Sequence, residues 1–219
     1  DTKYFLDMRD SLDDVSWKCL YMNEPIERDG LLFPEDELTT FNGTLPDGGL
    51  VAKYATCDVA WGGGDSLSMP IAYEYEDGSV YIVDVVFNKG DKTSTRPIVV
   101  GKLKRHLPHR VQFEANNGGD EYCDAVDAEL RKANIRLHLT HKKAPSTSSK
   151  LSRIIQASPD IKKFIFLDKK HRSKEYAAFM KELTSFIQTG KNKHDDAPDS
   201  LAMLATMIGR RYGKVTAIK

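Results

Sequence analysis

The chain has 219 residues, of which 40% are hydrophobic and 29% charged, and this composition is typical of a globular domain with one well-packed core. It has no apolar run near the roughly 20 residues that a transmembrane helix needs, which excludes a membrane-spanning protein. Acidic and basic residues balance at 32 each, but residues 131–193 hold 16 basic and only 4 acidic ones. This basic third predicts a polyanionic partner, because contacts from Lys and Arg to phosphates release counterions. A merely solvated surface is the alternative.

Cysteine and histidine usage indicates a protein of a reducing compartment without a zinc site. The three cysteines, Cys19, Cys57 and Cys123, are widely spaced and form no C-x-x-C pair. None of the six histidines forms an H-E-x-x-H motif. The chain begins with Asp1 and polar residues rather than with a secretory signal. Because it lacks an initiator Met, we interpret it as a fragment or a processed chain.

Residues 1–49 are acidic and rich in proline and glycine, with one modest helical pattern at residues 7–21. We interpret them as an N-terminal extension and residues 50–219 as a single domain. Three strands are predicted at the start of this domain, over residues 51–59, 66–75 and 80–88. The turns W-G-G-G-D and E-D-G-S join these strands, so we expect an antiparallel meander.

Helices and strands alternate in the remainder, which predicts βαβ units with parallel strands and therefore an α/β fold with a mixed sheet. The predicted helices cover residues 96–107, 119–133, 150–157 and 174–189, and a last helix runs from near Pro198 through Ile208. The predicted strands cover residues 110–114, 135–140 and 164–167. A short Ser-rich stretch at residues 146–149 is interpreted as a surface loop.

Two acidic residues lie where predicted strands end. Asp58 follows the apolar run Y-A-T-C, and Glu114 ends the run V-Q-F-E. The carboxyl ends of strands are the usual place for the site of an α/β protein, and a buried carboxylate is unfavourable unless it is paired or bound to a metal ion. For Asp58 the alternative is an acid exposed at a hairpin turn. For Glu114 it is an acid that stabilises the next helix dipole, a role that Asp120 or Glu121 fits better.

A third acidic group, in H-D-D-A-P-D-S-L-A, opens the last predicted helix. Asp196 and Asp199 are three residues apart on one helix face, where two acids repel each other unless a cation binds between them. We expect Asp199 to be the principal ligand, Asp196 an accessory one and Asp195 a helix N-cap, with the choice between Asp195 and Asp196 left open. His194 is expected to orient a water molecule or a phosphate, and a solvated histidine is the alternative.

The three acidic groups together predict a divalent-metal site at one edge of the sheet. Hard cations such as Mg²⁺ take oxygen ligands, and two ions about 3.5–4 Å apart stabilise the attacking and the leaving oxygen of a phosphodiester. The leading hypothesis is therefore a two-metal nuclease.

Basic residues around the Ser-rich stretch are candidates for DNA contacts. Lys150 and Arg153 lie one turn apart at a predicted helix start, where an ammonium and a guanidinium suit the gripping of phosphates. Lys142 and Lys143, in the basic third, are further candidates. The alternative is that all four are plain surface cations.

Four motifs follow one another along the chain: D-V-A-W-G-G-G-D-S around Asp58, F-E-A-N-N-G-G around Glu114, S-K-L-S-R-I around Lys150 and H-D-D-A-P-D-S-L-A around Asp199. In this order they resemble the nuclease domain of the large terminase subunits of tailed bacteriophages, which belong to the ribonuclease-H-like superfamily. The N-terminal stretches W-K-C-L-Y-M-N-E-P and G-L-L-F-P resemble the segment that joins the motor ATPase to that nuclease.

The resemblance implies a ribonuclease-H-like mixed sheet flanked by helices, with Asp58, Glu114 and Asp199 as ligands of two Mg²⁺ or Mn²⁺ ions and Asp58 bridging both. Asp196 occupies the position where the related Holliday-junction resolvases carry an acid three residues before the last one, which supports its accessory role. Lys150 and His194 complete the accessory set. The implied activity is the hydrolysis of concatemeric double-stranded viral DNA at the start and end of packaging, leaving a 5′ phosphate and a 3′ hydroxyl.

The motif G-x-x-x-x-G-K-[S/T] of the packaging ATPase occurs nowhere in the sequence, so the resemblance implies an isolated nuclease domain. The implied partners are double-stranded DNA, the ATPase domain of the same full-length chain, the portal protein and the small terminase subunit, in the cytoplasm of the host cell. Contacts to the DNA backbone predict a weak sequence preference. Two other functions stay open: a nuclease for branched junctions or transposon ends, and a non-catalytic module that docks on DNA or the portal.

Overall fold

The computed structural model describes residues 30–60, 64–144, 148–189 and 192–212. The chain divides into two compact units, residues 1–31 and 32–219, and all described helices and strands belong to the second unit. The predicted helical pattern at residues 7–21 and the motif W-K-C-L-Y-M-N-E-P lie outside the described residues. Each helix within the described ranges is too short or too polar to cross a membrane.

The described part of the chain forms seven strands and five α-helices. The strands are β1 (Thr39–Phe41), β2 (Leu50–Cys57), β3 (Leu67–Tyr75), β4 (Val80–Asn88), β5 (Arg110–Glu114), β6 (Leu139–Lys142) and β7 (Ile165–Leu167). The α-helices are α3 (Lys92–His106), α4 (Gly119–Lys132), α5 (Lys150–Ile161), α6 (Lys174–Thr184) and α7 (Asp196–Tyr212). The short 3₁₀ turns are η1 (Glu35–Glu37), η2 (Asn116–Gly118) and η3 (Lys169–His171).

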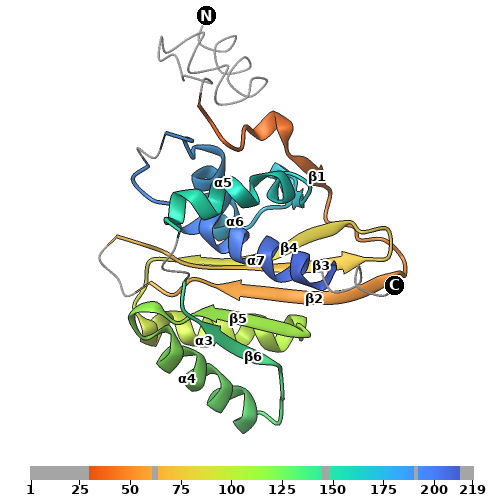
Figure 1. Cartoon of the computed structure of the whole chain (residues 1–219). Coiled ribbons are helices and arrows are strands. Elements are labelled where there is room, and N and C mark those ends of the chain that lie inside the picture. Colours follow the sequence, from red (N-terminus) through yellow and green to blue (C-terminus); the bar gives the residue numbers. More distant parts are fainter. Residues whose placement is uncertain (1–29, 61–63, 145–147, 190–191, 213–219) are drawn as a thin grey trace, which may run out of the picture. The chain divides into compact units, whose positions relative to one another are not determined.

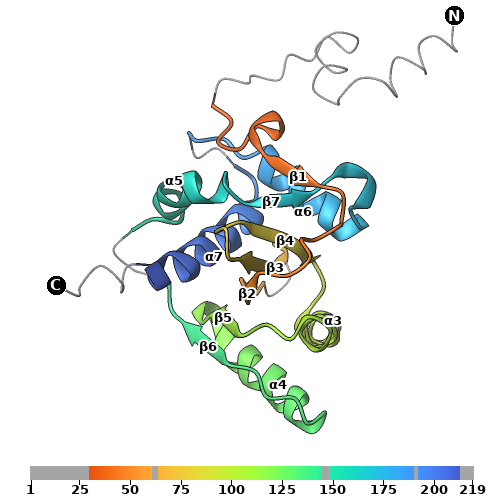
Figure 2. The ribbon, with the colours of Figure 1, turned by 90° about the vertical axis from the view of Figure 1, so that its right-hand side faces the viewer.

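The strands form one mixed sheet in the order β1-β7-β4-β3-β2-β5-β6 (Figures 1 and 2). The central strands β2, β3 and β4 are antiparallel neighbours, which confirms the predicted meander. On one side of the meander β5 lies parallel to β2 and β6 lies parallel to β5, as expected for βαβ units. On the other side β7 lies parallel to β4. The predicted α/β fold with a mixed sheet is therefore confirmed.

Helices cover both faces of the sheet, with α3 and α4 on one face and α5, α6 and α7 on the other (Figures 1 and 2). A separate hydrophobic cluster fills each interface. Side chains of β2 alternate between the two clusters, so that Tyr54 packs toward α5–α7 and Ala55 toward α3 and α4. By the same alternation Asp58, four residues after Tyr54, faces the α5–α7 side.

Two predicted boundaries differ from the structure in the α3 to β6 region. α3 begins at Lys92 rather than at residue 96, because the Asp91 carboxylate caps the helix by accepting a hydrogen bond from the Ser94 N–H at 2.8 Å. The strand predicted at 135–140 is β6, which begins only at Leu139. Of the residues before it, Ile135 packs against the hydrophobic cluster without pairing in the sheet.

The predicted helix at 174–189 is also shorter in the structure, where α6 ends at Thr184. Phe186 continues the apolar spacing of the helix, which explains the overprediction. It is buried instead in a loop, and its carbonyl accepts a hydrogen bond from the Leu32 N–H at 2.9 Å. At the other boundaries, α5 extends to Ile161 and α7 begins at Asp196.

Residues 32–49, which were assigned to the N-terminal extension, belong to the folded unit. Leu32, Phe33 and Leu38 are buried in the cluster that also holds α5–α7. β1 pairs with β7 and forms one edge of the sheet. β1 was not predicted from the sequence, because a strand of three residues is too short to show a period-two pattern.

Candidate functional site

The pairing of β2 with β5 places Asp58 and Glu114 next to each other. The two strands are parallel, with Cys57 opposite Phe113, so the residue after Cys57 and the last residue of β5 share one end of the sheet. On the other side, β3 holds Asp58 through Ser68: each backbone N–H donates to the carbonyl of the other residue, at 2.9 and 3.0 Å. The backbone of Asp58 is thus fixed between two strands.

Glu114 faces the same side of the sheet as Asp58. In β5, Val111 and Phe113 pack toward α3 and α4. The alternation of side chains therefore turns Gln112 and Glu114 toward α5 and α7. An amide N–H₂ of Asn116 donates a hydrogen bond to Glu114 Oε1 at 2.8 Å.

The first turn of α7 brings the third acidic group against the sheet. Asp199 is 1% exposed and Asp196 is 5% exposed. Asp196 Oδ2 accepts a hydrogen bond from the Ser66 N–H at 2.7 Å, which ties it to the segment before β3. Asp195 lies just before the helix, where its carbonyl accepts the first helical hydrogen bond, from the Asp199 N–H at 3.0 Å. The start of α7 therefore presents three acids at the sheet edge, and two of them are buried.

Buried hydroxyl groups fix this helix start on the strands. The Ser200 and Ser68 hydroxyls form a hydrogen bond of 2.8 Å between α7 and β3. The Thr56 hydroxyl of β2 donates to the Ser200 carbonyl, also at 2.8 Å. Because Ser200 follows Asp199 and Ser68 pairs with Asp58, these bonds couple the positions of the two acids.

The Lys150 ammonium lies among four carboxylates. Its Nζ atom is 2.8 Å from Asp195 Oδ1, 3.4 Å from Asp58 Oδ2 and from Asp199 Oδ2, and 3.8 Å from Asp196 Oδ1. Lys150 is the first residue of α5, so the packing of α5 beside α7 delivers this cation to the acids.

Arg153, one turn later in α5, joins the remaining acid to the cluster. Its guanidinium donates to both oxygens of Asp199 at 3.2 Å and lies 4.0 Å from Glu114 Oε2. The structure therefore brings the predicted acids together, with Lys150 and Arg153 between them. We call this group the carboxylate cluster; it consists of Asp58, Glu114, Asp195, Asp196 and Asp199 with Lys150 and Arg153.

The environment of the cluster opposes negative charge and favours a cation. The pKa of Asp58 is raised to about 7: burial is the main cause, Lys150 lowers the pKa in part, and the charges of Asp199 and Glu114 add to the rise. Burial also raises the pKa of Glu114, Asp196 and Asp199. For Lys150, burial lowers the pKa, but the surrounding carboxylates outweigh this effect and hold it well above its usual value.

The donor set fits a hard divalent cation. The carboxylates of the cluster supply only oxygen ligands, which Mg²⁺ and Mn²⁺ prefer. A positive group already lies where four of the carboxylates converge, so this position favours a cation. Asp58, Glu114, Asp196 and Asp199 are thus the side chains that could hold one or more ions there.

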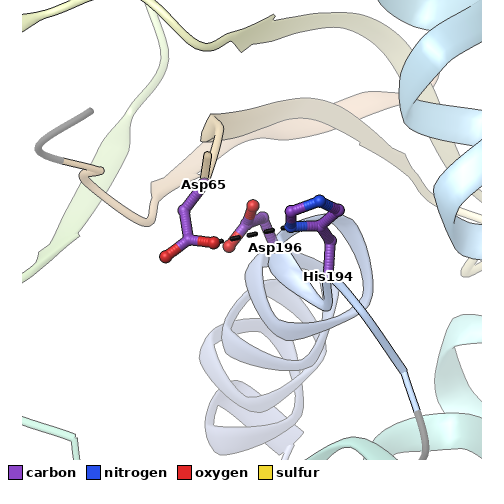
Figure 3. Close-up of side chains that lie close together, drawn as sticks. All are labelled: Asp65, His194 and Asp196. Atoms are coloured by element: carbon purple, nitrogen blue, oxygen red, sulfur yellow. Dashed lines mark ion pairs between the residues drawn. The ribbon is translucent and has the colours of Figure 1, made fainter. Parts of the chain in front are cut away.

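A second group of candidate ligands flanks the cluster and consists of Asp65, His194 and Asp196 (Figure 3). Figure 3 shows the three side chains pointing toward one another, and one ligand atom of each lies within 4.8 Å of the others. His194 Nδ1 is buried 3.5 Å from Asp65 Oδ1 and has no hydrogen-bond partner among the described residues. His194 and Asp196 were predicted as site residues from the sequence, whereas Asp65 was not. The one signal for Asp65 was an acid at the end of W-G-G-G-D, and no local pattern shows that Asp65 lies beside His194.

Lys142 and Lys143 lie outside the carboxylate cluster. Lys142 ends β6, where it pairs in register with Glu114. Both lysines are exposed and line a cavity of about 610 Å³ that begins at Glu114 and Arg153. They are therefore placed along an approach to the cluster rather than within it.

No protein-family model and no curated protein matches this sequence, but solved structures share its fold. The nuclease domain of the large terminase subunit gp2 of bacterial virus Sf6 has a TM-score of 0.51 and 10% sequence identity, over 72% of this chain and 89% of that domain. A mutant of the same domain, solved with manganese and beta-thujaplicinol, has a TM-score of 0.50 and the same identity and coverage.

The large terminase of a thermophilic bacteriophage, solved in complex with ADP, has a TM-score of 0.53 and 13% identity. The match covers 82% of this chain and 45% of that protein, so the chain spans less than half of the thermophilic phage terminase. These likenesses show that the chain has the ribonuclease-H-like fold, as the motif resemblance implied.

Proposed function

We propose that this chain is the nuclease part of a large terminase subunit, an endonuclease that depends on Mg²⁺ or Mn²⁺ and cuts concatemeric double-stranded viral DNA. The observation that carries the proposal is the meeting of Asp58, Glu114 and Asp199, from three distant segments, around cationic side chains at one edge of the sheet. The fold shared with the terminases of Sf6 and of the thermophilic phage, and the order of the four motifs, support the packaging role.

Asp58, Glu114 and Asp199 are the proposed ligands of two ions, with Asp196 as an accessory ligand. Asp58 would be the central ligand of the set, because the charges of Glu114 and Asp199 both act on it. When bound, two such ions stabilise charge on the attacking and the leaving oxygen of a phosphodiester. The burial of these carboxylates strengthens their hold on cations, because water screens the attraction less than at the surface.

Lys150 and Arg153 have complementary proposed roles. Without divalent ions, the Lys150 ammonium offsets part of the negative charge of the acids around it. We expect the ammonium to be displaced when ions bind and then to contact a DNA phosphate. Arg153 is the proposed orienting group, because its two hydrogen bonds hold the Asp199 carboxylate. His194, beside Asp196, is proposed to orient a water molecule or phosphate together with Asp65.

The proposed partners follow from the terminase assignment. The large terminase of the thermophilic phage is more than twice as long as the part that matches this chain, and its structure contains ADP. We therefore propose that an ATPase domain belongs to the same full-length protein, and that the portal protein and small terminase subunit act with it in the host cytoplasm. Lys142, Lys143, Lys150 and Arg153 are the proposed contacts to double-stranded DNA.

The test is cleavage of supercoiled plasmid by the purified chain in Mg²⁺, in Mn²⁺ or in a chelator, with Asp58→Asn as the inactive variant. We expect cutting with either metal, none in the chelator and none by the variant. Asp124→Asn is the matched control, because Asp124 is an exposed acid of α4 on the opposite face of the sheet. DNA binding without cutting under any metal would instead favour a module that docks on DNA or the portal.

A further inference from the structure

A groove opens beside the carboxylate cluster, between the β5–β6 edge of the sheet and the helices α5 and α7. Its cavity measures about 610 Å³. Glu114 and Arg153 line the end at the cluster, and Gln112 and Arg110 continue the lining along β5. Residues two apart on a strand share a face and rise by about 6.6 Å, so the lining side chains of β5 extend about 13 Å away from the cluster.

The sheet side of the groove is basic. Arg110, Lys142 and Lys143 are exposed there, and Arg153 adds a fourth cation at the cluster end. The described lining includes only two acids, one of which is Glu114. A wall with this excess of positive charge attracts a phosphate backbone and leads it toward the carboxylates.

The α7 side of the groove is largely apolar, and glutamine side chains of β5 and α5 lie beside it. Met203 of α7 is partly exposed there, beside the small side chains of Ala202 and Ala205. Gln112 and Gln156 also line the groove, and their side chains make no hydrogen bond with any described residue. An apolar surface next to unpaired amides suits a nucleobase, because its face can pack on the methionine while its edge bonds to the amides.

The size of the groove limits what can enter it. Its volume lies within the range of pockets for small molecules, roughly 300–1,000 Å³, which leaves room for one or two nucleotides but not for a base-paired segment. Building on the proposed nuclease function, we propose that the groove binds one unpaired strand of the DNA beside the cut phosphate, with a base between Met203 and Gln112 and phosphates along Lys142 and Lys143. DNA that is already unpaired there avoids the loss of pairing and stacking, so the protein prefers it.

The first experiment compares a labelled duplex that carries a short central bubble with the fully paired duplex of the same length. Binding to the whole chain is measured by fluorescence anisotropy in Ca²⁺, a cation that takes the same oxygen ligands. We expect the bubble DNA to bind about tenfold more tightly. Met203→Ala and Gln112→Ala should each lower this ratio about fivefold without changing the affinity for the paired duplex. Leu50→Ala, which removes an exposed apolar side chain outside the groove, should leave the ratio unchanged.

A second readout follows the base itself. A 2-aminopurine placed in the bubble should change its fluorescence on binding to the original chain and respond less to Met203→Ala. Thermal melting shows whether each variant is folded, and both substituted side chains are partly exposed, so truncation is tolerated.

The possible outcomes distinguish the proposed strand-binding groove from the proposed nuclease activity. Equal binding of the two DNAs, or a bubble preference that survives both Met203→Ala and Gln112→Ala, would overturn the groove while metal-dependent plasmid cutting still supported the proposed function. If the chain cuts no DNA but keeps the Met203-dependent preference for bubble DNA, the proposed strand-binding groove is supported and the proposed nuclease activity is refuted.

Discussion

The ionised carboxylate of Asp58 is needed for the proposed metal binding, but its burial makes the metal-free protein less stable. Burial raises its pKa to about 7, so the folded protein holds the Asp58 proton more tightly than the unfolded chain does. Metal-free protein therefore loses part of its stability as pH rises from about 4, where an ordinary Asp ionises, through about 7. A neighbouring cation offsets this loss of stability. Lys150 is such a cation, but it lowers the raised pKa of Asp58 only in part.

Asp58→Asn should make the metal-free protein more stable at about pH 8, by on the order of 1 kcal/mol, because the neutral amide replaces a charge that burial opposes. Urea unfolding in the presence of a chelator measures this difference. At about pH 4 the difference should shrink, since the carboxyl group of the original chain is then protonated. A variant less stable at about pH 8 would show that the attraction of Lys150 outweighs the burial of Asp58.

The stabilisation by Mn²⁺ should depend on pH, because the ion and protons compete for the same raised-pKa carboxylates. We expect the rise in melting temperature on adding Mn²⁺ to be large at about pH 8 and small at about pH 5. Melting curves with and without the ion at each pH provide the measurement. A rise of equal size at both pH values would place the ion away from these acids.

Lys150→Met tests the role of the internal cation. The variant removes the ammonium from four carboxylates while keeping a long side chain, so the metal-free protein should be less stable at about pH 8 and Mn²⁺ should bind more tightly. Titration calorimetry and melting curves measure the two effects. Lys143→Met is the matched control, because Lys143 is exposed and makes no ion pair with a described residue. Unchanged Mn²⁺ affinity would show that the ammonium does not compete with the ion.

At the scale of secondary structure, α7 is the element that completes the site, because its first turn carries Asp196 and Asp199 to strands that already hold Asp58 and Glu114. The buried Ser200–Ser68 hydrogen bond fixes the position of this first turn of α7 along the strands. Strand pairing alone would leave that position undetermined. The position of the first turn therefore depends on a few side-chain hydrogen bonds between α7 and the sheet.

Ser200→Ala should destabilise the protein by about 1–2 kcal/mol, because the Ser68 hydroxyl is left without this partner in a fully buried position. It should also weaken Mn²⁺ binding, since Asp199 is its neighbour in the helix. Thr206→Ala is the control, because among the described residues that hydroxyl bonds only within α7, where it donates to the Ala202 carbonyl. Loss of stability with full Mn²⁺ affinity would show that the hydroxyl does not position the acids.

At the scale of the whole molecule, two glutamates of η1 pair with part of the basic third. Lys162 pairs with Glu37, and Lys169 and Arg172 pair with Glu35. These ion pairs lie on η1 and its neighbours and account for basic residues far from the site. Among the described residues, Lys150 and the basic side chains of the groove are the cations placed at the carboxylate cluster, so DNA binding should depend on them rather than on the total basic charge.

Replacing Lys142 and Lys143 together by Gln should reduce the slope of log affinity against log salt by about 2, as expected for two lost phosphate contacts. Fluorescence anisotropy of duplex DNA over a range of salt concentrations measures the slope. Lys162→Gln with Lys169→Gln is the matched control, because both lysines pair with glutamates of η1. An equal loss of slope in the control would show that DNA lies across the basic third as a whole.

Local patterns were sufficient to predict six of the seven described strands and the gathering of the acids at one edge of the sheet. The period-two alternation of β2 and β5 turns Asp58 and Glu114 to one face, and the spacing of Asp196 and Asp199 puts them on one side of a helix start. Both patterns depend on neighbours within a few residues, which the sequence displays directly. The order of the motifs extended this to the ribonuclease-H-like fold, which the solved structures confirm.

Other features were decided only by the packing of distant segments. The sequence does not show that α5 carries Lys150 into the middle of the acids, that Asp65 meets His194, or that residues 32–49 complete the sheet. The groove beside Glu114 likewise exists only because α5 and α7 lie across β5 and β6. Such contacts join residues tens of positions apart, and no local periodicity encodes their distance. The sequence by itself therefore determined which acids face the site, and the tertiary structure decided what lies between and beside them.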